Sequence, residues 1–209
     1  MKKLLPVILA LLTFSAQAED EEKKITGPIV VIKTNMGTMK AMLHEDTAPK
    51  TVANFLKYTD DKFFDGTVFH RIINGFMIQG GGFELTEDEV IKQKKPNDPI
   101  INESAKGRKN KLGTLAMART NDPNSATSQF FINVKDNAAL DYPNNGGGYA
   151  VFGHLTEGLD VLNKIKAVKT HTTSTVNLGP GDRYAVTQSQ NVPVETVKII
   201  SIRRAEKKQ

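Results

Sequence analysis

The sequence predicts a mainly β protein, folded as a closed antiparallel barrel with two α-helices. Most of the chain from residue 28 onward divides into short runs of β-branched and aromatic residues that are separated by turn sequences. Only two segments, 48–59 and 157–168, have the apolar spacing of an amphipathic helix, and they lie far apart in the chain. Because closure removes exposed edge strands, a barrel is the architecture that suits many strands and so few helices.

Both predicted helices have an apolar face, and the first also has start signals. Thr47 is expected to cap the helix at 48–59, and Pro49 is acceptable in its first turn. The positions predicted to face the core are Val52, Phe55, Leu56 and Tyr58 in this helix and Leu159, Val161, Leu162 and Ile165 in the second.

The predicted strands follow one another with only turns, loops or a helix between them. They comprise residues 29–32, 38–43, 68–73, 76–78, 112–117, 129–134, 149–152 and 194–202. The dipeptide Asn74-Gly75 is a strong hairpin signal. Two long polar segments, 84–111 and 170–191, are predicted to be loops, and the sequence Asn144 to Gly148 is expected to be a mobile turn.

Composition indicates a globular protein of ordinary size. The chain has 209 residues, of which 39% are hydrophobic and 24% charged. We predict one domain at 28–204, with a disordered lead-in at 19–27 and a basic tail at 205–209. A net charge of +5 is too small and too dispersed to argue for a nucleic-acid partner. The sequence contains no cysteine, which excludes disulfides and thiol chemistry.

The first eighteen residues have the pattern of a secretion signal. Lys2 and Lys3 precede an apolar run from Leu4 to Leu12, and Ala16-Gln17-Ala18 has the small-x-small pattern of a cleavage site. The apolar run is too short to span a bilayer, which takes about 20 residues. We therefore expect cleavage after Ala18, export, and no stable membrane anchor.

One arginine stands out within the stretch TVFHRIINGFMIQGGGF at 67–83. Arg71 lies between apolar and β-branched neighbours, where a guanidinium is costly unless its charge is paired or used. An arginine on the solvent side of a half-buried strand is the simpler interpretation. A second stretch, TSQFFINV at 127–134, again combines a strand with a polar amide among aromatic residues, which favours a functional surface.

Four sequence blocks together resemble the cyclophilin family of peptidyl-prolyl isomerases. They are FHRIINGFMIQGGGF at 69–83, GTLAMART at 113–120, SQFFINV at 128–134 and GYAVFGHL at 148–155. The order and spacing match over nearly the whole domain, and the signal segment makes the chain most similar to the bacterial periplasmic members. The resemblance implies an eight-stranded antiparallel barrel capped by two helices, with a shallow groove on its outer face for X-Pro segments of extended or unfolded polypeptides. A periplasmic monomer is expected.

The resemblance also assigns roles to individual residues. Arg71 matches the family's catalytic arginine, which donates to the prolyl nitrogen while the bond twists, and Gln79 matches the glutamine that orients it. The remaining matches concern the substrate groove. Phe76, Met77 and Phe131 correspond to the apolar pocket for the proline ring, Leu140 to a flanking residue, Gln129 to a second amide, and Ala118 and Arg119 to a segment that contacts the peptide backbone.

Three positions depart from the family's common pattern. Arg119 stands where eukaryotic members commonly have an asparagine. Tyr149, which is also assigned to substrate binding, stands where many members have a histidine. Ala139 stands where eukaryotic members carry a tryptophan that also contacts cyclosporin. A tryptophan at this point would offer a large apolar surface and an N–H donor, so weak cyclosporin binding is expected.

Simpler interpretations of the same residues remain open. Phe76, Phe131 and Leu140 have the character of ordinary core residues, and His70 that of a satisfied strand histidine. The histidines share no metal-ligand spacing, and the glycine runs lack the signature of a phosphate loop, so we expect no metal and no cofactor. Two functions are therefore considered: an isomerase, and a non-catalytic chaperone that binds proline peptides in the same groove.

Overall fold

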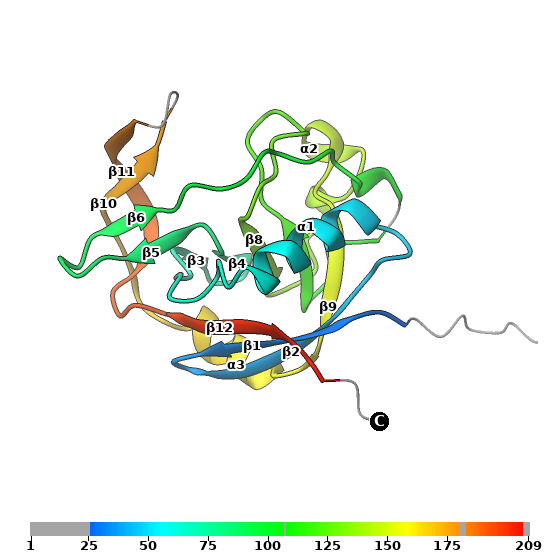
Figure 1. Ribbon diagram of the computed structural model, residues 1–209, viewed down its shortest axis with the longest axis horizontal. Coiled ribbons are helices and arrows are strands. Elements are labelled where there is room, and N and C mark those ends of the chain that lie inside the picture. The colour runs from blue at the N-terminus through cyan, green and yellow to red at the C-terminus, as the bar shows by residue number, and fades with distance from the viewer. Residues whose placement is uncertain (1–25, 107, 180–182, 207–209) are drawn as a thin grey trace, which may run out of the picture.

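The computed structural model describes residues 26–106, 108–179 and 183–206 (Figure 1). Its strands are β1 (Ile29–Thr34), β2 (Gly37–Leu43), β3 (Arg71–Ile73), β4 (Met77–Gly80), β5 (Phe83–Leu85), β6 (Ile91–Gln93), β7 (Thr114–Met117), β8 (Phe130–Asn133), β9 (Val151–Glu157), β10 (Thr170–Leu178), β11 (Tyr184–Pro193) and β12 (Ile199–Arg204). The α-helices are α1 (Pro49–Asp60), α2 (Asn144–Gly147) and α3 (Leu159–Lys166), and the 3₁₀ turns are η1 (Ser104–Lys106) and η2 (Ala138–Leu140). The predicted signal segment at 1–18 lies outside the described residues.

Eight strands form one curled antiparallel sheet in the order β12-β1-β2-β9-β7-β8-β4-β3. The mainly β architecture and the eight strands of this sheet agree with expectation, but the predicted closure of the barrel is wrong. Only a few backbone hydrogen bonds link the two ends of the sheet, such as Phe69 N to Val197 O at 2.9 Å and Ile199 N to Thr67 O at 2.7 Å. Closure would need a ladder between β12 and β3, and β3 is only three residues long.

Both faces of the sheet carry buried side chains near its β3 end. In β8, Phe130 and Ile132 point into the main core, while Phe131 belongs to a second apolar cluster on the opposite face. This follows from the alternation of side chains along a strand. The second cluster consists of Met77, Ala116, Phe131, Leu140 and Val151, with Ile73, Phe76, Ala118 and Tyr149 packed against it. A strand buried on both faces thus separates the core from an apolar outer surface.

The two long helices form close to the predicted positions. Helix α1 packs against β12 and buries Val52, Phe55, Leu56 and Tyr58, which confirms its predicted apolar face. Helix α3 packs against β2 and buries three of its four predicted positions. The exception is Leu159, which is 47% exposed because it is the first residue of the helix.

Two predicted loops contain regular structure. The polar segment 84–111 includes most of β5, all of β6 and η1, and 170–191 contains β10 and most of β11, which pair as an antiparallel hairpin. With β5 and β6, the hairpin forms a second sheet in the order β11-β10-β6-β5. The expected turn at 144–148 contains the four-residue α2, in which Asn145 and Gly146 have left-handed φ values of 54° and 67°, so the segment is a turn and not a regular helix. Threonine and valine are abundant in the hairpin, and β-branched residues suit an extended chain even when it is polar.

A buried glutamate, and not the predicted Thr47, satisfies the N-terminus of α1. The Thr47 hydroxyl accepts a hydrogen bond from Arg108 Nε at 3.1 Å and makes no capping bond. Glu103 Oε2 instead accepts hydrogen bonds from Thr51 N and Thr51 Oγ1, both at 2.8 Å, and Glu103 Oε1 accepts one from Lys50 N at 3.3 Å. A carboxylate here satisfies orphan N–H groups and faces the positive end of the helix dipole.

We expect Glu103→Ala to lower the free energy of unfolding by about 2 kcal/mol, because buried donors of α1 would lose a charged acceptor. Glu87→Ala is the matched control, since Glu87 is exposed in the β5–β6 turn, and it should change stability by less than about 0.5 kcal/mol. Urea denaturation of both variants measures the difference. Equal stability of the two variants would show that Glu103 is not an important cap.

Candidate active site

The predicted site residues come together on the outer face of the large sheet, around a cavity of about 190 Å³. Nine of the ten line it: Arg71, Phe76, Met77, Gln79, Ala118, Arg119, Phe131, Leu140 and Tyr149. The tenth, Gln129, is hydrogen-bonded to one of these nine. Residues separated by more than 70 positions in the sequence thus line one cavity, because β3, β4, β8 and β7 are neighbours in the sheet.

The apolar wall of the cavity is built from the second apolar cluster. Met77, Phe131 and Leu140 are each at most 5% exposed, and Phe76 is partly exposed beside them. The ring of Phe131 meets that of Tyr149 edge to face, with 5.7 Å between the ring centroids. Phe131 and Leu140, which could have been ordinary core residues, are therefore buried, but they lie away from the main core and next to an open space. Such a wall suits a compact apolar group.

A chain of three polar side chains crosses the sheet at the edge of this wall. Arg71 and Gln79 are directly opposite each other in the β3–β4 ladder, and Arg71 Nη1 lies 3.4 Å from Gln79 Oε1. Gln79 Nε2 in turn donates to Gln129 Oε1 at 2.9 Å. Donation thus runs from Arg71 through Gln79 to Gln129, because each amide accepts through its oxygen and Gln79 donates onward through its nitrogen. Among the described residues, Arg71 forms no ion pair with a carboxylate.

The glycines after β4 leave space for the side chain of Gln129. Gln129 precedes β8 and its side chain lies against Gly82, where an added Cβ would come within 2.3 Å of Gln129 Cγ. Gly81 has a φ of 81°, in the left-handed region that glycine adopts without strain. The glycine run thus serves close packing beside the site.

The side chain of Arg119 is held by contacts within the protein and is not free to bind a substrate. Its guanidinium donates to carbonyl oxygens of the α2 region, including Asn145 O at 2.7 Å and Gly148 O at 3.0 Å. Its Cζ also lies 4.5 Å from the centroid of the Tyr149 ring, a cation–π contact. Arg119 therefore holds α2 and Tyr149 against the cavity while its side chain forms part of the wall.

A buried network of asparagines behind the cavity was not predicted from the sequence. Asn137 Nδ2 donates to Phe76 O at 2.8 Å and to Asn133 Oδ1 at 2.7 Å. Asn133 Nδ2 continues to Asn110 Oδ1 at 3.1 Å, and Asn110 Nδ2 reaches Leu140 O at 3.2 Å. The network fixes the backbone of two wall residues. The sequence feature that could have indicated this network is Asn133, a polar residue at the end of the apolar strand FFIN.

His70, next to Arg71, is not the satisfied histidine that the sequence suggested. Its Nδ1 is buried without a hydrogen-bond partner among the described residues, and its ring lies 4.3 Å from that of Phe83, centroid to centroid. Burial lowers the pKa of His70 to about 3; an interaction with the Val68 backbone opposes this shift, and the charge of Arg71 adds to it. The imidazole is therefore neutral at neutral pH. In the described part of the chain, no three His, Asp or Glu side chains are grouped as metal ligands would be.

Activity is therefore expected to change less than about twofold between pH 6 and 8, because Arg71 stays charged and His70 stays neutral over this range. Protonation of His70 in the folded protein would begin only well below pH 6, since its pKa is lowered and not raised. Measuring kcat/KM for a short X-Pro peptide across this range tests the expectation. A steep limb near pH 6.5 would reveal a titrating group that the structure does not identify.

The fold and the cavity define a mainly β protein with an apolar pocket and a charged donor on the outer face of its sheet. Comparison with known proteins identifies the class further. Residues 29–204 match the family described as cyclophilin type peptidyl-prolyl cis-trans isomerase/CLD. The chain therefore belongs to the cyclophilin-type peptidyl-prolyl cis-trans isomerases, enzymes that interconvert the cis and trans forms of X-Pro bonds.

Individual relatives agree with this assignment. A peptidyl-prolyl cis-trans isomerase of Acinetobacter baylyi is 44% identical over 202 residues, which cover 97% of this chain and 95% of the relative. Peptidyl-prolyl cis-trans isomerase B of Escherichia coli is 51% identical over 145 residues, 68% of this chain and 86% of the relative. A cyclophilin-type isomerase of Cryptosporidium parvum, solved in the presence of the dipeptide Ala-Pro, has a TM-score of 0.65 and 25% identity, covering 86% and 99% of the two chains.

Proposed function

We propose that this isomerase accelerates X-Pro isomerisation during the folding of exported proteins, with Arg71 as the catalytic donor. The observation that carries the proposal is the position of Arg71, a charged donor held by Gln79 beside an apolar cavity. The proline ring would occupy the wall formed by Phe76, Met77 and Phe131, as the resemblance implies. The Ala-Pro dipeptide present with the Cryptosporidium relative supports a proline-containing ligand for this class of site.

The chemistry follows from the electronic structure of the amide. Resonance gives the C–N bond partial double-bond character and a rotation barrier of about 18–20 kcal/mol. Twisting the bond localises the lone pair on the prolyl nitrogen, which then becomes an acceptor. A hydrogen bond from Arg71 to this nitrogen would exist only in the twisted form, so it stabilises the transition state over both ground states. No bond is broken, and the reaction calls for neither a nucleophile nor a proton acceptor.

Gln79 and Gln129 would act as positioning residues. The guanidinium needs one orientation to reach the prolyl nitrogen, and the hydrogen bond to Gln79 Oε1 restricts it. The bond from Gln79 Nε2 to Gln129 Oε1 then restricts Gln79 itself. Ala118 N donates to Gln129 O at 3.0 Å, which joins the 118–119 segment to the same arrangement. We propose that this segment contacts the substrate backbone.

Export is proposed from the sequence pattern at residues 1–18, which leads us to place the mature domain at 28–204 in the periplasm. Within the described residues, the structure has no helix whose length and apolar character would let it cross a membrane. We further propose that the mature protein acts as a monomer, with unfolded or extended polypeptides as its partners.

Replacing Arg71 with alanine should reduce kcat/KM by about 100-fold or more, the usual effect of removing one donor to a transition state. The fold should remain intact, because Arg71 is partly exposed and forms no ion pair among the described residues. Lys33→Ala serves as the control, since it removes one positive charge from an exposed position of β1. Isomerisation of an X-Pro peptide, followed by exchange NMR, gives the rates.

The same variant separates the isomerase from a non-catalytic chaperone. If Arg71 acts mainly in the transition state, Arg71→Ala should bind a proline peptide with nearly the affinity of the wild type while losing turnover. Calorimetric titration of both proteins with one peptide measures this. A folded variant that keeps the wild-type kcat/KM would rule out the proposed role of Arg71.

Weak cyclosporin binding is a further part of the proposal. Ala139 is exposed in η2, next to the cavity residue Leu140. We expect Ala139→Trp to increase cyclosporin affinity about thirtyfold, because an aromatic anchor is commonly worth 2 kcal/mol or more. Ala138→Trp places the same side chain at the exposed neighbouring position and should change affinity little. The idea fails if the wild type is inhibited as tightly as Ala139→Trp in an isomerisation assay.

A further inference from the structure

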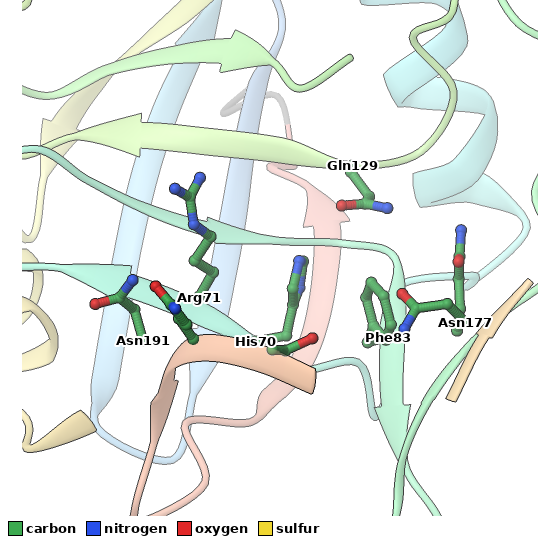
Figure 2. A pocket seen from close by; sticks show the side chains of 9 residues that line it. His70, Arg71, Phe83, Gln129, Asn177 and Asn191 are labelled. Carbon is green, nitrogen blue, oxygen red and sulfur yellow. The ribbon is translucent and has the colours of Figure 1, made fainter. Parts of the chain in front are cut away.

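A second cavity lies on the other side of Arg71, and apart from Arg71 and Gln129 its lining residues have no role assigned above. Its volume is about 340 Å³, and Figure 2 shows His70 between Arg71 and Phe83, with Gln129 across the cavity. The residues that line it are His70, Arg71, Phe83, Gln93, Gln129, Asn177, Ser189, Gln190 and Asn191. Arg71 is the residue that it shares with the first cavity.

The β10–β11 hairpin supplies one wall of this second cavity. Figure 1 shows the hairpin extending beyond the large sheet at the β5–β6 side. Val176 pairs with Lys92 in the small sheet, and Leu178 N donates to Gln93 Oε1 at 2.9 Å. These bonds fix the hairpin beside Arg71, although most of its own side chains are exposed.

A β-bulge presents the hairpin residues to the cavity. His171 pairs with Val192 and Thr173 pairs with Ser189, so Thr172 lies opposite two residues, Gln190 and Asn191. Asn191 has a φ of 61°, in the left-handed region. A bulge of this kind redirects side chains and is frequent beside functional sites. Here it brings Gln190 and Asn191 to the same cavity as Arg71.

The polar groups of the lining are rich in unused donors. The side-chain oxygens of Gln93 and Gln129 already accept hydrogen bonds, from Leu178 N and Gln79 Nε2. Within the described part of the chain, the side-chain atoms Gln93 Nε2, Gln129 Nε2 and Arg71 Nη2 donate no hydrogen bond. A carboxylate is acceptor-only and matches such a set of donors.

The charge of the residues that line the cavity also favours a carboxylate ligand. None of the nine residues is acidic, and Arg71 is the one that carries a full charge at neutral pH, because burial keeps His70 neutral. A basic side chain would face the guanidinium without a carboxylate to offset it. An acidic side chain would gain charge-assisted hydrogen bonds.

We propose that the second cavity is a specificity subsite for an acidic side chain of the substrate, Asp or Glu, close to the X-Pro bond. The inference rests on the proposed function, since a proline in the first cavity places its sequence neighbours beside Arg71. An extended chain advances about 3.3 Å per residue, so a residue within about three positions of the proline can reach the second cavity. The hairpin thereby selects among X-Pro segments that the first cavity accepts equally.

The test compares pairs of peptides that differ only in Glu or Gln at one position, from three residues before the proline to three residues after it. Exchange NMR measures kcat/KM without a coupled protease, whose own specificity would interfere. For the wild type we expect Glu to exceed Gln by about fivefold at one position, the effect of a partly exposed charge-assisted hydrogen bond. At the other positions the ratio should be near one.

Gln190→Glu places a negative charge in the lining, and it should bring the Glu-to-Gln ratio down to one or below. The control is Gln188→Glu, with the same charge change on the same strand but outside the cavity lining, and it should keep the wild-type ratio. Asn191→Gly tolerates the left-handed backbone and should lower the ratio by removing one amide.

A wild-type ratio near one at every position would overturn the subsite while leaving the isomerase intact. Equal changes in Gln188→Glu and Gln190→Glu would also overturn it, because the effect would then be a general one of net charge. Failure of the wild type to accelerate any of the peptides would instead contradict the proposed function on which the subsite depends.

Discussion

The structure depends on one strand that is covered on both faces. All four residues of β8 are buried, because Phe130 and Ile132 fill the main core and Phe131 and Asn133 face the outer side. An ordinary half-exposed strand would present polar groups on its outer face. Here the outer face carries an apolar cluster and, behind it, the asparagine network. The site is therefore anchored directly to the core, and its wall cannot shift without disturbing the sheet.

Arg71 is the second constraint on the site. A half-buried guanidinium is costly when it lacks a carboxylate partner, and within the described residues Arg71 has only the amide oxygen of Gln79. A salt bridge within the protein would compensate the charge better, but it would occupy the guanidinium before a ligand binds. The cost in stability is consistent with a charge reserved for a ligand. Among the described arginines, Arg203 and Arg204 show the opposite arrangement, because each forms close ion pairs with an aspartate.

The two cavities beside Arg71 differ in how the chain supports them. The first rests on the large sheet and on buried hydrogen bonds, which favour one fixed geometry. The second has a wall on a largely exposed hairpin, which is joined to β6 of the small sheet and packs its buried Val192 against Val68 and Phe83. Segments of this kind tolerate sequence change better than the elements that they border. A division between a fixed reaction site and a variable neighbouring wall would let substrate preference change while the reaction stays the same.

Much of the fold and the site could be predicted from the sequence, because local patterns encode them. Runs of β-branched and aromatic residues specified eight of the twelve strands, apolar spacing specified α1 and α3, and the four family blocks contain all the residues that line the first cavity except Leu140. The pattern could not show that the sheet stays open, since pairing between β3 and β12 depends on residues more than 120 positions apart. It also could not show that the threonine-rich segment at 170–178 is a strand. A polar segment becomes a strand only where a partner offers hydrogen bonds, and β6 and β11 do so only in the folded chain. The second cavity could not be predicted either, because Arg71 and Asn191 come together only through tertiary contacts.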